Sequence, residues 1–184
     1  FIDRTQQRPL TFFNNGVVAH ISMANPFCEN ISQLLAQEIE KLLNNGKTMH
    51  IGGTYLAMEG PAFSTRAESN LYRDWGCSII GMTNHTEARL AKEAEIAYTS
   101  LSMVTDYDCW HPKHKNVTVN MVINNLRSNA ELAEKLFIAI ASRISTVRPV
   151  SESHSVLKDG LVTNKDKVPI ETLKKIELFT KTYW

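Results

Sequence analysis

Two carboxylates lie two residues apart in the segment Thr105-Asp106-Tyr107-Asp108. In an extended chain such residues point to the same side, so we expect Asp106 and Asp108 to share a site. Mutual repulsion and partial burial favour keeping one of them protonated near neutral pH. The pair then offers an acceptor and an O–H donor, the complement of an adenine edge with its N7 acceptor and 6-amino donor. A metal-binding, helix-capping or merely solvated acidic loop is the alternative.

Three further side chains could bind a flat nucleoside. Phe63 could stack on a base, and the alternative is a position in the hydrophobic core. Met82 could pack against a ribose, although methionine also fills gaps in cores. The hydroxyl of Thr83 could donate to an anion or a sugar, or it could cap the helix that follows. These residue types are compatible with a nucleoside site and do not specify one.

Cysteine and histidine offer a weaker possibility. Cys109, His111 and His114 carry the donor atoms that zinc prefers, but their spacing matches no standard zinc pattern and no fourth ligand is evident. We therefore predict no metal site. The chain has 3 cysteines, and their odd number and wide separation favour a reducing, intracellular setting over a disulfide framework.

Composition excludes two broad classes of protein. The 184 residues contain 20 Lys+Arg and 19 Asp+Glu, giving a net charge of +1. This balance argues against a nucleic-acid binder, which needs a basic face to neutralise phosphates. No window approaches the roughly 18 apolar residues of a membrane span. At 43 % hydrophobic residues, the chain falls within the usual composition of a globular domain.

The elements that position these residues alternate along the chain. Hydrophobic periodicity predicts a sheet flanked by helices, which is the α/β class. Ligands of such sheets gather at the carboxyl ends of strands, so the residues after Met58, Met82 and Val104 are the expected site. The predicted strands cover 48–58, 78–82 and 97–104, and residues 16–21 are predicted as a short strand or an extended segment. The predicted helices cover 30–43, 65–75, 86–95, 118–144 and 170–179.

Several short segments occur in the order typical of one enzyme family. They are Phe1-Ile2-Asp3-Arg4-Thr5, residues 59–69, Trp75-Gly76, Gly81-Met82-Thr83, Glu87-Ala88 with residues 90–94, and residues 105–110. Together they resemble the purine nucleoside phosphorylase superfamily, and within it the methylthioadenosine phosphorylases. The tail around residues 161–173 is similar to the bacterial branch.

The resemblance implies a purine nucleoside phosphorylase-like fold, with a mixed central sheet between helices in three layers. It also implies phosphorolysis of S-methyl-5′-thioadenosine to adenine and 5-methylthioribose 1-phosphate, without a cofactor and with inorganic phosphate as co-substrate. A cytoplasmic homotrimer is expected, with no nucleic-acid or membrane partner. Another purine nucleoside phosphorylase, acting on inosine, guanosine or methylthioinosine, a nucleoside hydrolase and a non-catalytic fragment are the alternatives.

The resemblance assigns roles to individual residues. Asp106 is the expected catalytic residue, and its carboxylate favours a 6-amino purine because relatives acting on 6-oxopurines carry Asn there. The other implied contacts are Met82 with the ribose, Thr83 with phosphate, Asp106, Tyr107 and Asp108 with adenine, Phe63 and Ser64 with the base site, Val119, Val122 and Ile123 with the 5′-methylthio group, and His20 with a neighbouring subunit's 5′ pocket.

The family's phosphate-binding loop and Arg-His pair precede the segment that Phe1 begins. The resemblance therefore implies that residues 1–184 are the C-terminal part of a single phosphorylase domain, without its N-terminal strands. Thr83 and nearby backbone are too few donors to hold a phosphate dianion well. We expect a separate N-terminal fragment to supply the remaining donors if the chain is to be active.

Overall fold

The computed structural model describes residues 1–43, 48–112 and 118–184. The chain divides into two compact units, each formed by three stretches of sequence. Over the described residues, no helix is long and apolar enough to cross a membrane. The first unit comprises Phe1–Gln6, Gln33–Met82 and Leu101–Arg148, and the second comprises Gln7–Ser32, Thr83–Ser100 and Pro149–Trp184.

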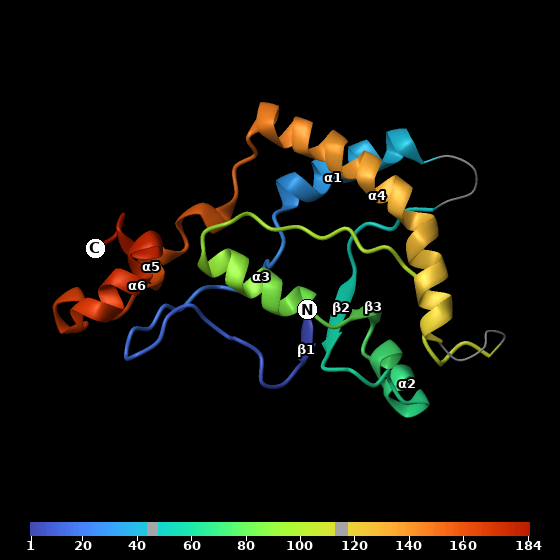
Figure 1. Ribbon diagram of the computed structural model, residues 1–184, viewed down its shortest axis with the longest axis horizontal. Coiled ribbons are helices and arrows are strands. Elements are labelled where there is room, and N and C mark those ends of the chain that lie inside the picture. The colour runs from blue at the N-terminus through green and yellow to red at the C-terminus, as the bar shows by residue number, and fades with distance from the viewer. Residues whose placement is uncertain (44–47, 113–117) are drawn as a thin grey trace. The chain divides into compact units, whose positions relative to one another are not determined.

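A parallel sheet forms the centre of the first unit. Its strands are β1 (Ile2–Arg4), β2 (Thr54–Met58) and β3 (Cys77–Gly81), in the order β1-β2-β3 (Figure 1). Leu56 and Ala57 on the central strand are fully buried. Because neighbouring strand residues face opposite sides, this burial means that β2 is covered on both faces, as parallel strands usually are. The predicted α/β class is confirmed.

The strand predicted at 97–104 is wrong, and the short strand or extended segment predicted at 16–21 forms one bridge. Residues 97–104 form no strand, and the Tyr98 carbonyl accepts a hydrogen bond from the Cys28 N–H at 2.7 Å. Residues 16–21 contribute a single antiparallel bridge, from Ala19 to Leu161. An alternating pattern specifies an extended backbone, but a strand also requires a neighbouring strand that continues the ladder.

Helix α2 (Arg66–Asp74) joins β2 to β3 and begins at a capping box. The Thr65 hydroxyl accepts from the Glu68 N–H at 3.2 Å, and the Glu68 carboxylate accepts from the Thr65 N–H at 2.8 Å. Hydrogen bonds from the Thr65 backbone and then its side chain hold the pKa of Glu68 below its usual value. This local motif explains why the prediction of a helix at 65–75 is confirmed.

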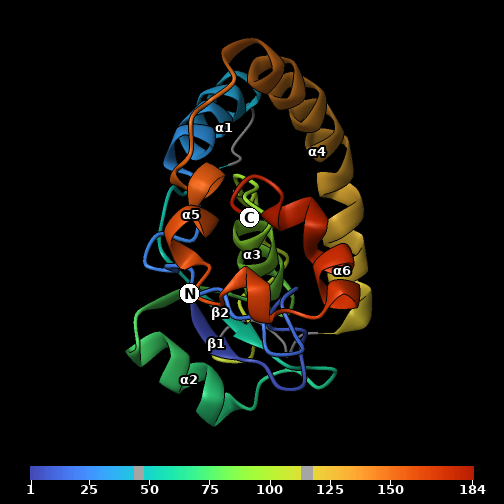
Figure 2. The ribbon, with the colours of Figure 1, turned by 90° about the vertical axis from the view of Figure 1, so that its left-hand side faces the viewer.

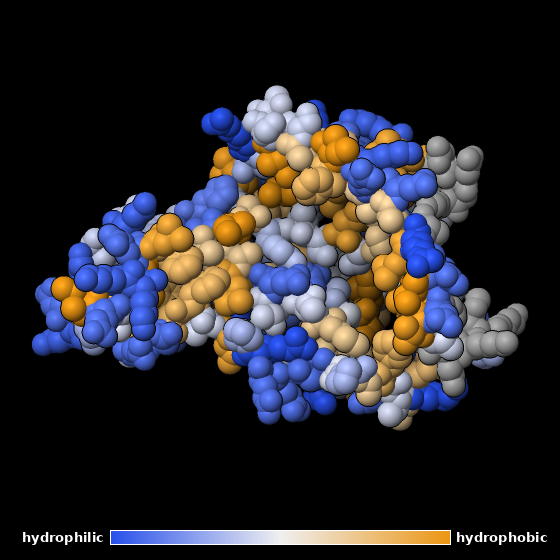
Figure 3. All heavy atoms as spheres, in the orientation of Figure 1, coloured by the Kyte–Doolittle hydropathy of each residue, from blue (hydrophilic) through white to orange (hydrophobic). Residues whose placement is uncertain are grey.

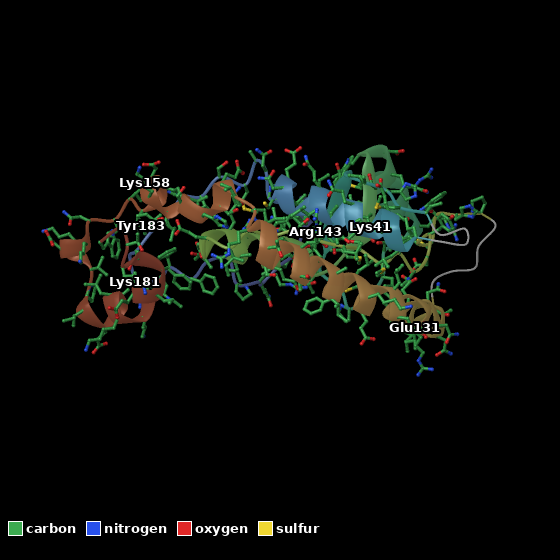
Figure 4. The ribbon with its side chains drawn as sticks, turned by 90° about the horizontal axis from the view of Figure 1, so that it is seen from above. Lys41, Glu131, Arg143, Lys158, Lys181 and Tyr183 are labelled. Carbon is green, nitrogen blue, oxygen red and sulfur yellow. The ribbon has the colours of Figure 1, made fainter. Side chains whose placement is uncertain are left out.

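Helices α1 (Glu29–Leu42) and α4 (Val119–Val147) form an apolar cluster in the first unit, with Leu35 and Ile39 packed against Leu136. Figure 2 shows α1 beside the C-terminal half of α4. Glu38 on α1 is buried and pairs with Lys41 at 2.6 Å and with Arg143 of α4 at 3.2 Å. Figure 4 shows Lys41 and Arg143 close together on the two helices. The burial of Glu38 is thus accompanied by two cationic partners, as a buried carboxylate requires.

The second unit contains α3 (Asn84–Glu93), α5 (Leu157–Gly160), α6 (Ile170–Thr180) and the 3-10 turns η1 (Glu152–Ser155) and η2 (Lys165–Lys167). Lys92 is 2 % exposed, and its ammonium donates to the Asn25 carbonyl and the Glu152 carboxylate. These two acceptors satisfy a charge that burial would otherwise penalise. The apolar core of this unit is formed by Phe13, Val17, Leu157, Val168 and Ile176.

We expect Gly81→Ala to destabilise the fold by about 3 kcal/mol, because it overpacks the sheet. A Cβ at Gly81 would lie 1.6 Å from the Tyr55 hydroxyl oxygen and 2.5 Å from Tyr55 Cζ. Tyr55 lies on the central strand and its ring contacts Phe1 at 5.4 Å between centroids, which limits its freedom to move. Urea unfolding of the wild type and the variant measures the difference in their free energies of unfolding.

The control for this substitution is Gly76→Ala. Gly76 has a φ of +76°, and a Cβ there would meet no atom within 4 Å. Alanine there introduces backbone strain alone and should cost about 1 kcal/mol. If the two variants lose the same free energy of unfolding, the clash between a Cβ at position 81 and Tyr55 is not the cause of the loss.

Tyr183 gives the second unit a pH-dependent contact. Its hydroxyl donates to the Glu95 carboxylate at 2.6 Å, and that carboxylate raises the pKa of Tyr183 to about 12. The contact stabilises the folded state fully below the unfolded pKa of about 10 and is lost as pH rises toward about 12. We expect the free energy of unfolding of the wild type to exceed that of Tyr183→Phe by about 1 kcal/mol at pH 8. The difference should shrink between pH 10 and 12 in urea titrations, and a constant difference would contradict the assignment.

Candidate functional site

The carboxyl ends of β2 and β3 meet through Gly60 and Met82. Gly60 has a φ of +71°, a conformation that favours glycine, and a Cβ there would lie 2.8 Å from the Met82 sulfur. Met82 directly follows β3, and the thioether occupies the space that the missing Cβ leaves over the loop after β2. The structure therefore places Met82 at the sheet edge where the sequence predicts a site.

Residues 105–111, named the acidic loop from here on, do not form the extended segment that the sequence suggests. Asp108 has a φ of +56°, and its N–H donates to Asp106 Oδ1 at 2.8 Å. The Thr105 hydroxyl donates to Asp106 Oδ2 at 2.6 Å. Aspartate side chains readily bond to the backbone two residues on and tolerate the left-handed conformation, which explains the turn.

The turn gives the two carboxylates different environments. Both Asp106 oxygens accept hydrogen bonds from within the acidic loop. Asp108 Oδ2, in contrast, is buried and makes no hydrogen bond to any described residue. A buried carboxylate oxygen without a donor is costly, because it has lost its hydration without replacement. Asp108 Oδ2 therefore keeps acceptor capacity that no described residue fills.

Two contacts attach the acidic loop to neighbouring elements of the first unit. The Cys109 thiol donates to the Ser64 carbonyl at 3.3 Å, which joins the acidic loop to the loop after β2. The Asn125 side-chain amide donates to the Thr105 carbonyl, which joins it to the first turns of α4. The structure thus brings Ser64 and the acidic loop together, and it connects the first turns of α4 to them.

The aromatic and apolar side chains expected at the site are open to solvent. Phe63 is 48 % exposed and Tyr107 56 %, so the core alternative for Phe63 is wrong. On α4, Val119 and Ile123 are exposed and Val122 is half-buried. Figure 3 shows hydrophobic side chains along α4 on the face in view. The exposed apolar side chains of Phe63, Val119 and Ile123 present surface against which an apolar ligand group can pack.

Thr83 and His20 belong to the second unit. Thr83 holds the N-cap position of α3, but its side chain makes no capping hydrogen bond, so the capping alternative is wrong and the exposed hydroxyl stays available to a ligand. The His20 side chain is exposed, and its backbone N–H donates to the Gly160 carbonyl at 2.8 Å. Neither observation tests the predicted contacts with phosphate and with a neighbouring subunit.

The cysteine and histidine cluster does not assemble as zinc ligands among the described residues. Cys109 donates its thiol hydrogen to a carbonyl, and His114 lies outside the described residues. Within the ranges that the structure describes, no three His, Cys, Asp or Glu side chains are placed to hold a metal ion. All three cysteines are free thiols.

Sequence reasoning missed one contact at the site. Arg73, in the last turn of α2, lies over the indole of Trp110 at 3.8 Å from guanidinium carbon to ring centroid. Trp110 in turn contacts Tyr107 at 6.0 Å and His111 at 5.0 Å between ring centroids. Periodicity cannot predict such a stack, because the arginine and the tryptophan belong to segments far apart in the sequence.

Proteins named S-methyl-5′-thioadenosine phosphorylase resemble this chain along its whole length. It is 66 % identical over 184 residues to an S-methyl-5′-thioadenosine phosphorylase of Prochlorococcus marinus, covering 100 % of this chain and 59 % of that protein. It is 50 % identical over 183 residues to the enzyme of the same name from Thermosynechococcus vestitus, covering 63 % of it. The chain therefore spans about three fifths of the length of these relatives.

Solved structures agree with the fold described above. A methylthioadenosine phosphorylase from an antarctic soil metagenomic library superposes with a TM-score of 0.90 at 42 % identity, over 97 % of this chain and 62 % of that one. A mutant adenosine/methylthioadenosine phosphorylase from Schistosoma mansoni, in complex with adenine, gives a TM-score of 0.77 at 30 % identity, over 88 % and 64 % of the two chains. The expected purine nucleoside phosphorylase-like fold is confirmed.

A family model provides the broadest comparison. The model described as the phosphorylase superfamily matches residues 1–142. The matched range includes the three strands, the acidic loop and most of α4. Because this match covers well over half of the sequence, the chain belongs to the phosphorylase superfamily.

Proposed function

We propose that this chain provides the base- and sugar-binding part of a phosphorylase that converts S-methyl-5′-thioadenosine and phosphate to adenine and 5-methylthioribose 1-phosphate. The observation that carries the proposal is the buried Oδ2 of Asp108, which has no hydrogen-bond partner among the described residues and lies in the same turn as Asp106. The 6-amino group of adenine would donate the hydrogen bond that this oxygen lacks. The names of the relatives support the same substrate.

Asp106 would act on the leaving group. Phosphate attacks the anomeric carbon while the glycosidic bond breaks, and negative charge develops on the departing purine. A proton held between Asp106 and purine N7 neutralises that charge, a stabilisation made mainly in the transition state. The bonds from Thr105 and from the Asp108 N–H fix the carboxylate in one orientation, so little reorganisation is needed during the reaction.

Carboxylates also determine which purine the site accepts. Asp108 Oδ2 and the Asp106 carboxylate would accept from a 6-amino group and repel a 6-oxo group. A site whose buried acceptor is left unpaired by the wrong base discriminates strongly, because the missing hydrogen bond is not replaced by water. Adenine nucleosides are therefore the proposed substrates.

The remaining contacts would surround the sugar and its substituents. Figure 3 shows apolar side chains along α4, where exposed Val119 and Ile123 would enclose the 5′-methylthio group together with Val122. Phe63 would stack on the base and Ser64 and Tyr107 would line the base site. The other proposed contacts are Met82 with the ribose, Thr83 with phosphate and His20 with the 5′ pocket of a neighbouring subunit in a homotrimer.

The test is a product assay on the chain and on a chimera. The chimera joins the chain to the part of the Prochlorococcus marinus relative that this chain does not match, and that part is included as a source of phosphate donors. We expect adenine release from methylthioadenosine only when phosphate is present. Faster cleavage of inosine would favour a 6-oxopurine phosphorylase, release without phosphate would favour a hydrolase, and an inactive chimera would contradict the proposal.

A further inference from the structure

The acidic loop holds Asp108 at an energetic cost, even though aspartate tolerates the left-handed conformation better than most residues do. Asp108 has a φ of +56°, which costs a residue other than glycine about 1 kcal/mol or more. Its Oδ2 is also buried without a partner among the described residues. Such a turn persists only where its surroundings hold it in place. The contacts that reach the loop from other elements therefore determine how much of the time Asp108 is placed to bind a ligand.

Among the described residues, contacts reach the acidic loop from Ser64, Arg73 and Asn125. The first two attach to the residues directly after Asp108, through Cys109 and Trp110. A thiol is a weak donor, so the bond from Cys109 is weaker than a stack in which a guanidinium lies 3.8 Å from the centroid of a tryptophan ring. The capping box at Thr65 fixes the start of α2, the helix that carries Arg73.

We propose that Arg73 is a positioning residue, which holds the acidic loop through its stack on Trp110 and so keeps Asp108 in place to recognise a 6-amino purine. The inference rests on the proposed function for the identity of the ligand. Arg73 itself is exposed and is not proposed to contact substrate. When the stack is lost, the competent arrangement of the loop becomes less populated, and the apparent affinity falls by the same factor.

The experiment measures adenine and hypoxanthine binding to the full chain by calorimetry, together with hydrogen exchange of the Asp108 amide. We expect Arg73→Gln to weaken adenine binding about fivefold and to accelerate exchange of that amide by a similar factor. Binding of hypoxanthine, which lacks the 6-amino group, should change less, so discrimination between the bases narrows. Global destabilisation alone would weaken the binding of both bases by the same factor, so it would not change the ratio of their affinities.

Conservative and double variants test the stack itself. Arg73→Lys keeps the charge without the planar guanidinium and should recover part of the affinity. In a Trp110→Phe background, Arg73→Gln should have a smaller effect, since the weaker ring has less stacking to lose. Arg127→Gln removes an exposed arginine from α4 and should leave both measurements unchanged.

The outcomes separate the inference from the proposed function. Unchanged amide exchange in Arg73→Gln overturns the inference, whatever the binding result. So does an equal effect of Arg73→Gln in the wild-type and Trp110→Phe backgrounds, or an affinity loss shared equally by adenine and hypoxanthine. A wild-type chain that binds no adenine contradicts the proposed function, and the exchange measurement then still decides whether Arg73 holds the loop.

Discussion

Asp106→Ala is expected to lower the turnover number of the active chimera by roughly 10²–10⁴-fold, the usual range for removing a general acid, with a much smaller change in substrate binding. The reason is that the proton shared with purine N7 matters most when negative charge has built up on the leaving base. Steady-state assays with methylthioadenosine, varying nucleoside at saturating phosphate, separate the two effects.

The matched variant for this prediction is Asp106→Asn. Its side-chain oxygen can still accept from the Asp108 N–H, which Asp106 Oδ1 does at 2.8 Å, so the turn is retained while the group that holds the proton is lost. Both variants should therefore lose turnover. An asparagine variant with wild-type turnover, or an alanine variant that loses only affinity, would rule out the proposed role of Asp106.

Asp108→Gly is expected to weaken adenine binding about 10- to 100-fold without lowering the free energy of unfolding. Glycine removes the carboxylate that accepts from the 6-amino group, and it suits the φ of +56° at this position better than aspartate does. It also removes a buried oxygen that has no hydrogen-bond partner among the described residues, so stability should be equal or higher. Calorimetric titration with adenine and urea unfolding measure the two quantities.

Asp108→Gly is expected to weaken adenine binding without lowering the free energy of unfolding, and this combination distinguishes it from most substitutions in a binding site. Most substitutions that damage a site also destabilise the fold, so a loss of binding alone is ambiguous. Asp108→Ala, which lacks the carboxylate but keeps a Cβ, should bind as weakly as the glycine variant and be less stable than it. Retained adenine affinity in the glycine variant would show that Asp108 does not read the base.

Local features are what made much of the fold predictable. The helix at 65–75 was predictable because its periodicity and its Thr65 and Glu68 cap lie within a few residues of one another. The strand at 78–82 was predictable from a short apolar run, and the structure places β3 at Cys77–Gly81. The strand predicted at 97–104 failed because pairing depends on a partner, which no local pattern specifies.

The sequence by itself determined the α/β class, the order of the site segments and the presence of two acidic residues after a predicted strand. Only the tertiary structure decided that Asp106 is bonded within its own loop while Asp108 keeps a buried acceptor, and that Arg73 lies over Trp110. The physical reason is range: helix propensity and caps act over a few residues, whereas burial and ring stacking depend on segments far apart in the sequence.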